Sequence, residues 1–192
     1  MKILPIYNKL LSETKNNSII AYHGTNHKFD NFTDDFVGGK DAYDQEGPGI
    51  YFTSSLKNAS SYGSIVYRVN LRPNKIISTK ISKAPINQIE FLIKQAPDWE
   101  ASVQNWDESI RIGLKKACSD ILQYNETPHL QFQQVWVDFY RSNSVQYVRN
   151  MTKLGYDMVV IPNRNSLISN EENITHYVVL NPNIIEVVDI MS

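Results

Sequence analysis

Two apolar segments near the N-terminus, each bounded by glycine, set the tightest limits on the fold. The first, residues 19–21, leads into Tyr22-His23-Gly24-Thr25. The second, residues 50–53, follows Gly47-Pro48-Gly49 and contains Tyr51 and Phe52. Continuous apolar runs of this length between turn residues are typical of buried strands. The sequence therefore predicts two core strands with polar turns at their ends.

The residues around these strands predict mainly local elements. A short helix is expected over 56–62, with Ser54 or Ser55 as its N-cap and Gly63 as its stop. A further short helix is expected over 6–11. Residues 26–49 show little periodicity and many turn residues, which predicts a long loop, and loops of this length are usually functional or mobile.

The C-terminal two thirds change from strand to helix and back. Residues 64–71 alternate as a half-buried strand does, and residues 86–154 have apolar positions at helical spacing, which predicts three or four helices. The pattern returns to strand at 156–161. Two more strands, 176–180 and 184–188, are expected to form a hairpin around Asn181-Pro182-Asn183.

This order of strands, helices and strands favours a mixed α+β fold over alternating βαβ units. The chain has 192 residues, 42% of them hydrophobic and 20% charged, which fits one domain over residues 1–192 with a helical insert at about 86–154.

Composition excludes several functional classes. The net charge of −1 gives no broad electrostatic footprint for nucleic acid, and no apolar run approaches the ~18 residues that span a bilayer. One cysteine allows no intrachain disulfide, and no Cys/His cluster has metal-site spacing. We therefore expect a cytoplasmic protein with neither a metal nor a membrane partner, acting in its own cell or in the cytoplasm of a target cell.

Two tyrosines suggest a binding site for a flat heteroaromatic ring. Tyr51 lies on a predicted strand and Tyr62 ends the helix after it, so a chain that turns back can hold one ring between two phenols. The alternative, that both are core aromatics, stays open in a chain with eleven tyrosines. Behind His23, Gly24 offers main-chain polar groups and Thr25 offers a hydroxyl.

These motifs resemble those of the ADP-ribosyltransferases. The order YHGT, then GPGIYFTSS with a tyrosine eleven residues after Tyr51, then THYVVLNP at 175–182, is similar to the His-Tyr-Glu branch, which includes diphtheria-type toxins and poly(ADP-ribose) polymerases. The similarity is greatest to small phage and bacterial members. It implies a split β-sheet core of two packed small sheets and NAD as the ADP-ribose donor.

The resemblance also implies a role for each residue. His23 would bind the adenosine ribose, the Gly24 backbone would hold the nicotinamide carboxamide, and Tyr51 and Tyr62 would sandwich the nicotinamide ring. Ala59 stands where several members have a carboxamide-binding serine, so either Ser60 or Ser61 replaces it or that bond is absent. The loop 26–49 would cover the dinucleotide. The remaining expected cofactor contacts are Tyr22, Thr25, Gly49 and Phe52.

One position departs from the family pattern. His176 stands where a glutamate bonds a hydroxyl of the nicotinamide ribose, and it completes the expected catalytic set of His23, Tyr51 and His176. A carboxylate there stabilises positive charge on the ribose, whereas a neutral imidazole cannot offset that charge. Three readings follow: His176 is an unusual positioning group, Glu171 or Glu172 folds back into the site, or transfer has been lost.

The expected function is that of an NAD-dependent mono-ADP-ribosyltransferase, acting as a toxin or effector. A protein is the expected acceptor, and a nucleic acid or a small molecule is the open alternative. The rival functions are an NAD glycohydrolase and a catalytically degenerate module that binds NAD or a partner.

Overall fold

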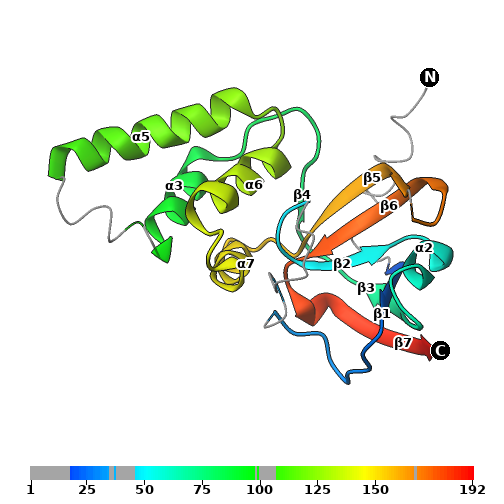
Figure 1. The fold of residues 1–192 in the computed structure, drawn as a ribbon. Helices are drawn as coiled ribbons and strands as arrows, with labels where there is room; N and C mark the ends of the chain where they lie inside the picture. Colours follow the sequence, from blue (N-terminus) through cyan, green and yellow to red (C-terminus); the bar gives the residue numbers. More distant parts are fainter. Residues whose placement is uncertain (1–17, 35–36, 38–45, 98, 100–106, 167) are drawn as a thin grey trace.

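A computed structural model describes residues 18–34, 37, 46–97, 99, 107–166 and 168–192 (Figure 1). The predicted helix at 6–11 lies outside these residues, as do residues 35–36 and 38–45 of the predicted loop at 26–49. The elements are β1 (Ile19–Thr25), β2 (Ile50–Thr53), α2 (Leu56–Ser60), β3 (Ile65–Leu71), β4 (Ile76–Ile77), α3 (Ile86–Lys94), α5 (Asp107–Tyr124), α6 (Pro128–Phe139), α7 (Ser144–Lys153), β5 (Met158–Ser166), β6 (Glu171–Val179), a 3₁₀ turn (Pro182–Ile184) and β7 (Ile185–Met191).

The strands form one sheet with the order β4-β5-β6-β2-β1-β3-β7. Its pairings are antiparallel except for that of β4 with β5. Strands β1 and β2 are joined through the single register pair Tyr22–Thr53, whereas β1 and β3 pair along their whole length. In place of two packed small sheets, the described residues therefore form one mixed sheet whose two halves meet at a narrow junction.

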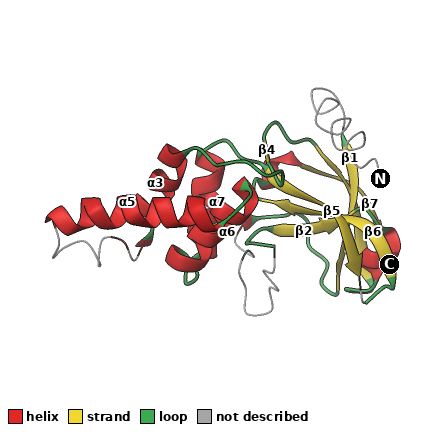
Figure 2. Cartoon of the chain, turned by 90° about the horizontal axis from the view of Figure 1, so that it is seen from above, coloured by secondary structure: helices red, strands yellow, loops and turns green. Residues whose placement is uncertain are grey.

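The predicted helical insert is present as α3, α5, α6 and α7. These helices gather beside the β4-β5 end of the sheet (Figures 1 and 2), while α2 packs on β1, β2 and β3. Local sequence explains where they begin: the Thr127 side chain accepts from the amide of Leu130 at the start of α6, and Asn143 accepts from Gln146 at the start of α7. None of the helices in the described part of the chain has the length and apolarity needed to cross a bilayer.

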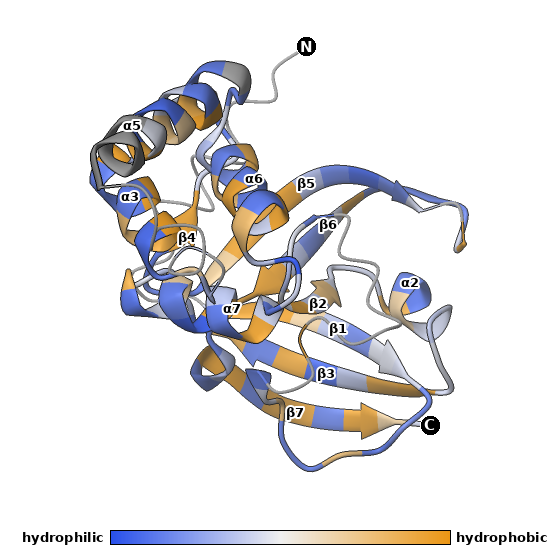
Figure 3. Cartoon of the chain, turned by 60° about the vertical axis from the view of Figure 1, so that its left-hand side comes forward, coloured by the Kyte–Doolittle hydropathy of each residue, from blue (hydrophilic) through white to orange (hydrophobic). Residues whose placement is uncertain are grey.

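Two hydrophobic cores lie on opposite faces of the sheet. One face packs against the insert helices through Val159, Val178 and the partly buried Tyr51. The other face carries Phe52, Tyr177 and their apolar neighbours. Strand β3 alternates hydrophobic and hydrophilic residues along its length (Figure 3), which is typical of a strand with one face in a core. Strand β7, by contrast, is exposed over residues 186–190.

The predicted hairpin at the C-terminus is wrong. Strand β6 pairs with β2 and β5, whereas β7 crosses to the other half of the sheet and pairs with β3. Asn181 accepts a hydrogen bond from the amide of Asn183, which starts the short 3₁₀ turn over 182–184. A tight turn residue therefore directs the chain to a distant strand rather than back onto its neighbour.

Candidate active site

The sheet register determines which predicted residues share a face. Tyr51 lies opposite Val178, and Thr53 lies opposite both His176 and Tyr22. Directly paired residues point to the same side of a sheet, and successive residues alternate. Tyr51 and His176 therefore share the face that packs on the insert helices, and Gly24, two residues after Tyr22, belongs to that face as well.

Helix α2 packs against β1 at Gly24, without room for a side chain. A Cβ at Gly24 would lie 1.8 Å from the carbonyl oxygen of Ala59 and 3.3 Å from Cβ of Tyr62. Gly63 meets the backbone of Thr25 in the same way, at 2.1 Å. This packing brings Gly24, Ala59 and Tyr62 together; the binding of a ring and a carboxamide by these residues stays a prediction.

The two tyrosines of the predicted clamp have different surroundings. The Tyr51 ring packs against the helical core, and its hydroxyl donates to the carbonyl of Gly47 at 2.6 Å. The amide of Glu46 donates to the same hydroxyl at 3.3 Å. Tyr62, by contrast, is 52% exposed. Both lie near Gly24 in the fold, and the stacking of a ring between them stays a prediction.

His23 is next to Tyr51 through the backbone, with its ring on the opposite face of the sheet. Its Nδ1 donates to the Tyr51 carbonyl at 2.8 Å, because a carbonyl can only accept. Phe32 and Phe52 lie 5.3 and 5.5 Å from its ring, centroid to centroid. Burial lowers the pKa of His23. The binding of a ribose by His23 remains a prediction.

The smaller predicted contacts are engaged with their own backbone. Thr25 Oγ1 accepts from the amide of His27. The hydroxyls of Ser60 and Ser61 each donate to a carbonyl one helical turn earlier, those of Leu56 and Lys57. A carboxamide bond from either serine would therefore require its rotamer to change.

Two further predicted contacts are held in the sheet. Phe52 is 3% exposed. Gly49 lies tightly against β6, where a Cβ would be 2.5 Å from Cγ1 of Val178.

His176 is in contact with a carboxylate that the sequence reasoning missed. Its Nδ1 lies 3.0 and 3.2 Å from the two carboxylate oxygens of Glu46. Nε of Arg164 lies 2.6 Å from Oε1 of Glu46, and the Glu46 side chain is only 7% exposed. The one available signal was an acidic residue directly before Gly47-Pro48-Gly49. Nothing local relates it to a residue 130 positions later.

Glu171 and Glu172 do not fold back onto His176. Strand β6 is continuous from Glu171 to Val179, so no loop separates these residues from His176. Glu171 instead accepts a hydrogen bond from the hydroxyl of Ser55 at 2.7 Å, beside the start of α2. Glu172 is exposed.

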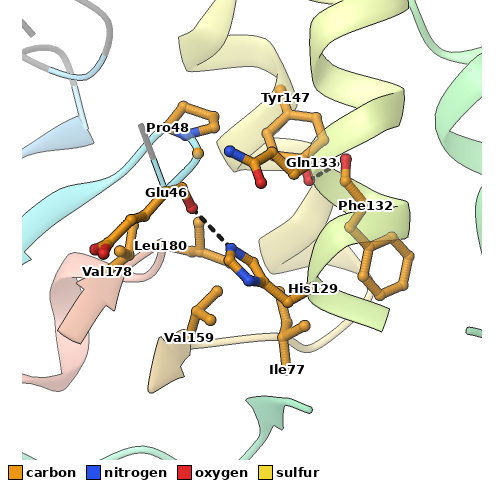
Figure 4. A pocket seen from close by; sticks show the side chains of 11 residues that line it. Glu46, Pro48, Ile77, His129, Phe132, Gln133, Tyr147, Val159, Val178 and Leu180 are labelled. Carbon is orange, nitrogen blue, oxygen red and sulfur yellow. Dashed lines mark hydrogen bonds between the residues drawn. The ribbon is translucent and has the colours of Figure 1, made fainter. Parts of the chain in front are cut away.

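A small pocket lies behind Glu46, between the sheet and helices α6 and α7 (Figure 4). Nε2 of His129 donates to the main-chain carbonyl of Glu46 at 2.8 Å there, and burial lowers the pKa of His129. The pocket has room for about one water molecule. It is lined by neither Tyr51 nor Tyr62, but Glu46 and Gly47, which line it, hydrogen-bond the Tyr51 hydroxyl.

A sequence model of one family matches residues 14–189, and its description is "ADP-ribosyltransferase in polyvalent proteins". The chain belongs to this family. Members of the ADP-ribosyltransferase family use NAD as the donor of ADP-ribose. Comparison with curated proteins gives no match.

Among solved structures, this chain is similar to one described as "Crystal structure of an anti-CRISPR protein". The identity is 13% and the TM-score 0.38, over 89% of this chain and 96% of that one. A TM-score this low supports no argument about fold or function. Among the described residues, no group of three or more His, Cys, Asp or Glu side chains is arranged to hold a metal ion.

Proposed function

We propose that the protein is an NAD-dependent mono-ADP-ribosyltransferase of the His-Tyr-Glu type, with a protein as acceptor. Membership of the family over residues 14–189 is the observation that carries the proposal. The shared face of Gly24, Tyr51 and His176 supports the branch, because a nicotinamide ring on that face would reach all three. We place the reaction in the cytoplasm of the producing cell or of a target cell.

The residues of this face fit the nicotinamide end of NAD. The close packing of α2 on Gly24 brings Tyr62 near the backbone that would hold the carboxamide. The Tyr51 phenol is fixed by two hydrogen bonds to the turn before β2, so its ring is held ready for stacking. A ring stacked on one tyrosine gains about 0.5–1.5 kcal/mol beyond the burial of apolar area.

Transfer of ADP-ribose requires that the protein position NAD and stabilise the positive charge that develops on the ribose. The bond between C1′ of the ribose and the nicotinamide nitrogen breaks, and its electron pair passes to the ring nitrogen. The ribose then carries positive charge, which fixed dipoles and carboxylates stabilise in a site that excludes water. An acceptor nucleophile attacks C1′ and releases its proton to solvent. His176 would orient a ribose hydroxyl on this face.

One observation favours a second candidate function. A histidine at position 176 weakens the expected charge stabilisation, which would suit a degenerate module that binds NAD or a partner without transfer. The two functions make different predictions for the fate of nicotinamide. The NAD glycohydrolase, with water as acceptor, predicts that nicotinamide is released without transfer of ADP-ribose to a macromolecule.

The test is incubation of the purified protein with NAD labelled in the adenosine half, with and without cell lysate. Nicotinamide and labelled macromolecules together support the transferase, and protease treatment identifies a protein acceptor. Nicotinamide without labelled macromolecules supports the glycohydrolase. Absence of both products overturns catalysis and leaves the binding module, whose NAD affinity calorimetry then measures.

A further inference from the structure

The cluster around Glu46 connects two of the predicted catalytic residues, Tyr51 and His176, with Arg164 and His129. The Glu46 carboxylate contacts His176 on β6 and Arg164 on β5. Its amide donates to the hydroxyl of Tyr51 on β2, and its carbonyl accepts from His129 on α6. A buried carboxylate with both main-chain polar groups bound by side chains is held in place from several sides.

We propose that Glu46 supplies the carboxylate that position 176 lacks, so that the catalytic glutamate of this protein lies in the turn before β2. This inference rests on the proposed transferase function. It assigns the charge stabilisation to Glu46 and the contact with the ribose hydroxyl to His176.

Side-chain geometry places the carboxylate close to where a glutamate at 176 would put it. In histidine, Nδ1 is two bonds from Cβ, as the carboxyl carbon is in glutamate. Since Oε2 of Glu46 lies 3.0 Å from Nδ1 of His176, the negative charge is about one hydrogen bond beyond its usual position in the family.

The hydrogen bond to Glu46 then determines which nitrogen of the neutral His176 ring carries the proton. A carboxylate only accepts, so Nδ1 of His176 carries the proton that it donates to Glu46. In the neutral ring, Nε2 is left as an acceptor, which suits a ribose hydroxyl as donor. His176 would thus contact the ribose hydroxyl and Glu46 would supply the negative charge, whereas a single glutamate does both in the family pattern.

Arg164 pairs with Oε1 of Glu46 and offsets part of this charge, whereas Oε2 is the carboxylate oxygen nearest to His176. The Arg164 side chain is 44% exposed, whereas those of His176 and Glu46 are 20% and 7% exposed. No water fits between the guanidinium and Oε1, so Arg164 both anchors this oxygen from the outer side and offsets part of its charge. Oε2 is directed to Nδ1 of His176 at 3.0 Å, and the remaining charge acts there.

The test moves the carboxylate from one position to the other. Glu46→Gln should lower kcat for nicotinamide release about 100-fold, as loss of one electrostatic contact does elsewhere, and leave KM for NAD nearly unchanged. Adding His176→Glu to that variant should restore at least about a tenth of the lost rate. His176→Glu alone should bring no gain, since two carboxylates would then face each other. Glu46→Asp, which keeps the charge, should retain more activity than Glu46→Gln.

The matched control is Glu186→Gln, which removes the carboxylate of the exposed Arg72–Glu186 pair at the same 2.6 Å. It should leave kcat unchanged, and thermal unfolding confirms that each variant is folded. A folded Glu46→Gln protein with wild-type kcat overturns the inference alone, as does a double variant no faster than Glu46→Gln. If Glu46→Gln does not fold, Glu46→Asp decides: a kcat no higher than the background overturns the inference. Wild-type protein that releases no nicotinamide overturns the inference and the proposed function together.

Discussion

Replacement of Gly24 by alanine tests the packing that assembles the predicted nicotinamide site. The new Cβ would lie 1.8 Å from the carbonyl oxygen of Ala59. To reach 3.4 Å, where ordinary contact begins, the carbonyl has to move by about 1.6 Å. That oxygen belongs to the backbone of α2, whose start is capped by Ser55 and whose Asn58 side chain donates to Ser166. No change of rotamer can relieve the overlap.

Overpacking of this kind costs about 1–3 kcal/mol of unfolding free energy, and a rigid backbone neighbour puts Gly24→Ala near the upper value. For a chain of this size, about 3 kcal/mol lowers Tm by roughly 6–12 °C. Because α2 carries Ala59 and leads to Tyr62, we expect NAD affinity to fall as well. The assay is urea and thermal unfolding, with calorimetry for NAD.

Gly113→Ala is the matched control, because nothing lies within 4 Å of a Cβ at this position in α5. Alanine in a helix interior gains about 1 kcal/mol over glycine, so this variant should be slightly more stable than the wild type. A Gly24→Ala protein with wild-type Tm would refute the close approach of α2 to β1.

Three further predictions concern single side chains. Ser55→Ala removes the cap of α2 and the hydrogen bond to Glu171, and should lower the unfolding free energy in urea by about 1–2 kcal/mol; an unchanged value contradicts the cap. Burial lowers the pKa of His23 and His129 below 6.5 in the folded protein. As the pH falls, these histidines are therefore protonated in the unfolded chain before they are in the folded one, and the free energy of unfolding should decline below about pH 6.5. A His23→Gln variant that shows the full wild-type decline contradicts this. Tyr51→Ala should weaken NAD binding about tenfold in calorimetry while the protein stays folded; retained affinity contradicts the clamp.

Local features of the fold were predictable from the sequence. Strand β2 has the predicted bounds, Ser55 is the N-cap of α2, and the insert helices lie within 86–154. Each of these depends on neighbours a few residues apart, through periodicity or a capping side chain. The hairpin failed because the partner of β7 is decided by the whole sheet, and Asn181-Pro182-Asn183 is as compatible with a crossing as with a tight turn.

In the candidate site, too, the sequence predicted local features and missed a contact between residues far apart in the chain. The motifs located Gly24, Tyr51 and His176, and the structure puts them on one face of the sheet. Glu46 escaped notice, because only the pairing of β2 with β6 brings it to His176. Alternation along β1 also turns the His23 ring away from the Tyr51 phenol, which no motif spacing reveals.

The most direct test of the account is chromatographic measurement of nicotinamide released from NAD by the wild-type protein and by the folded Glu46→Gln variant, side by side. We predict steady release by the wild type and about 100-fold slower release by the variant. Equal rates would contradict the role of Glu46, and no release by the wild type would contradict the assignment of the protein as an active transferase.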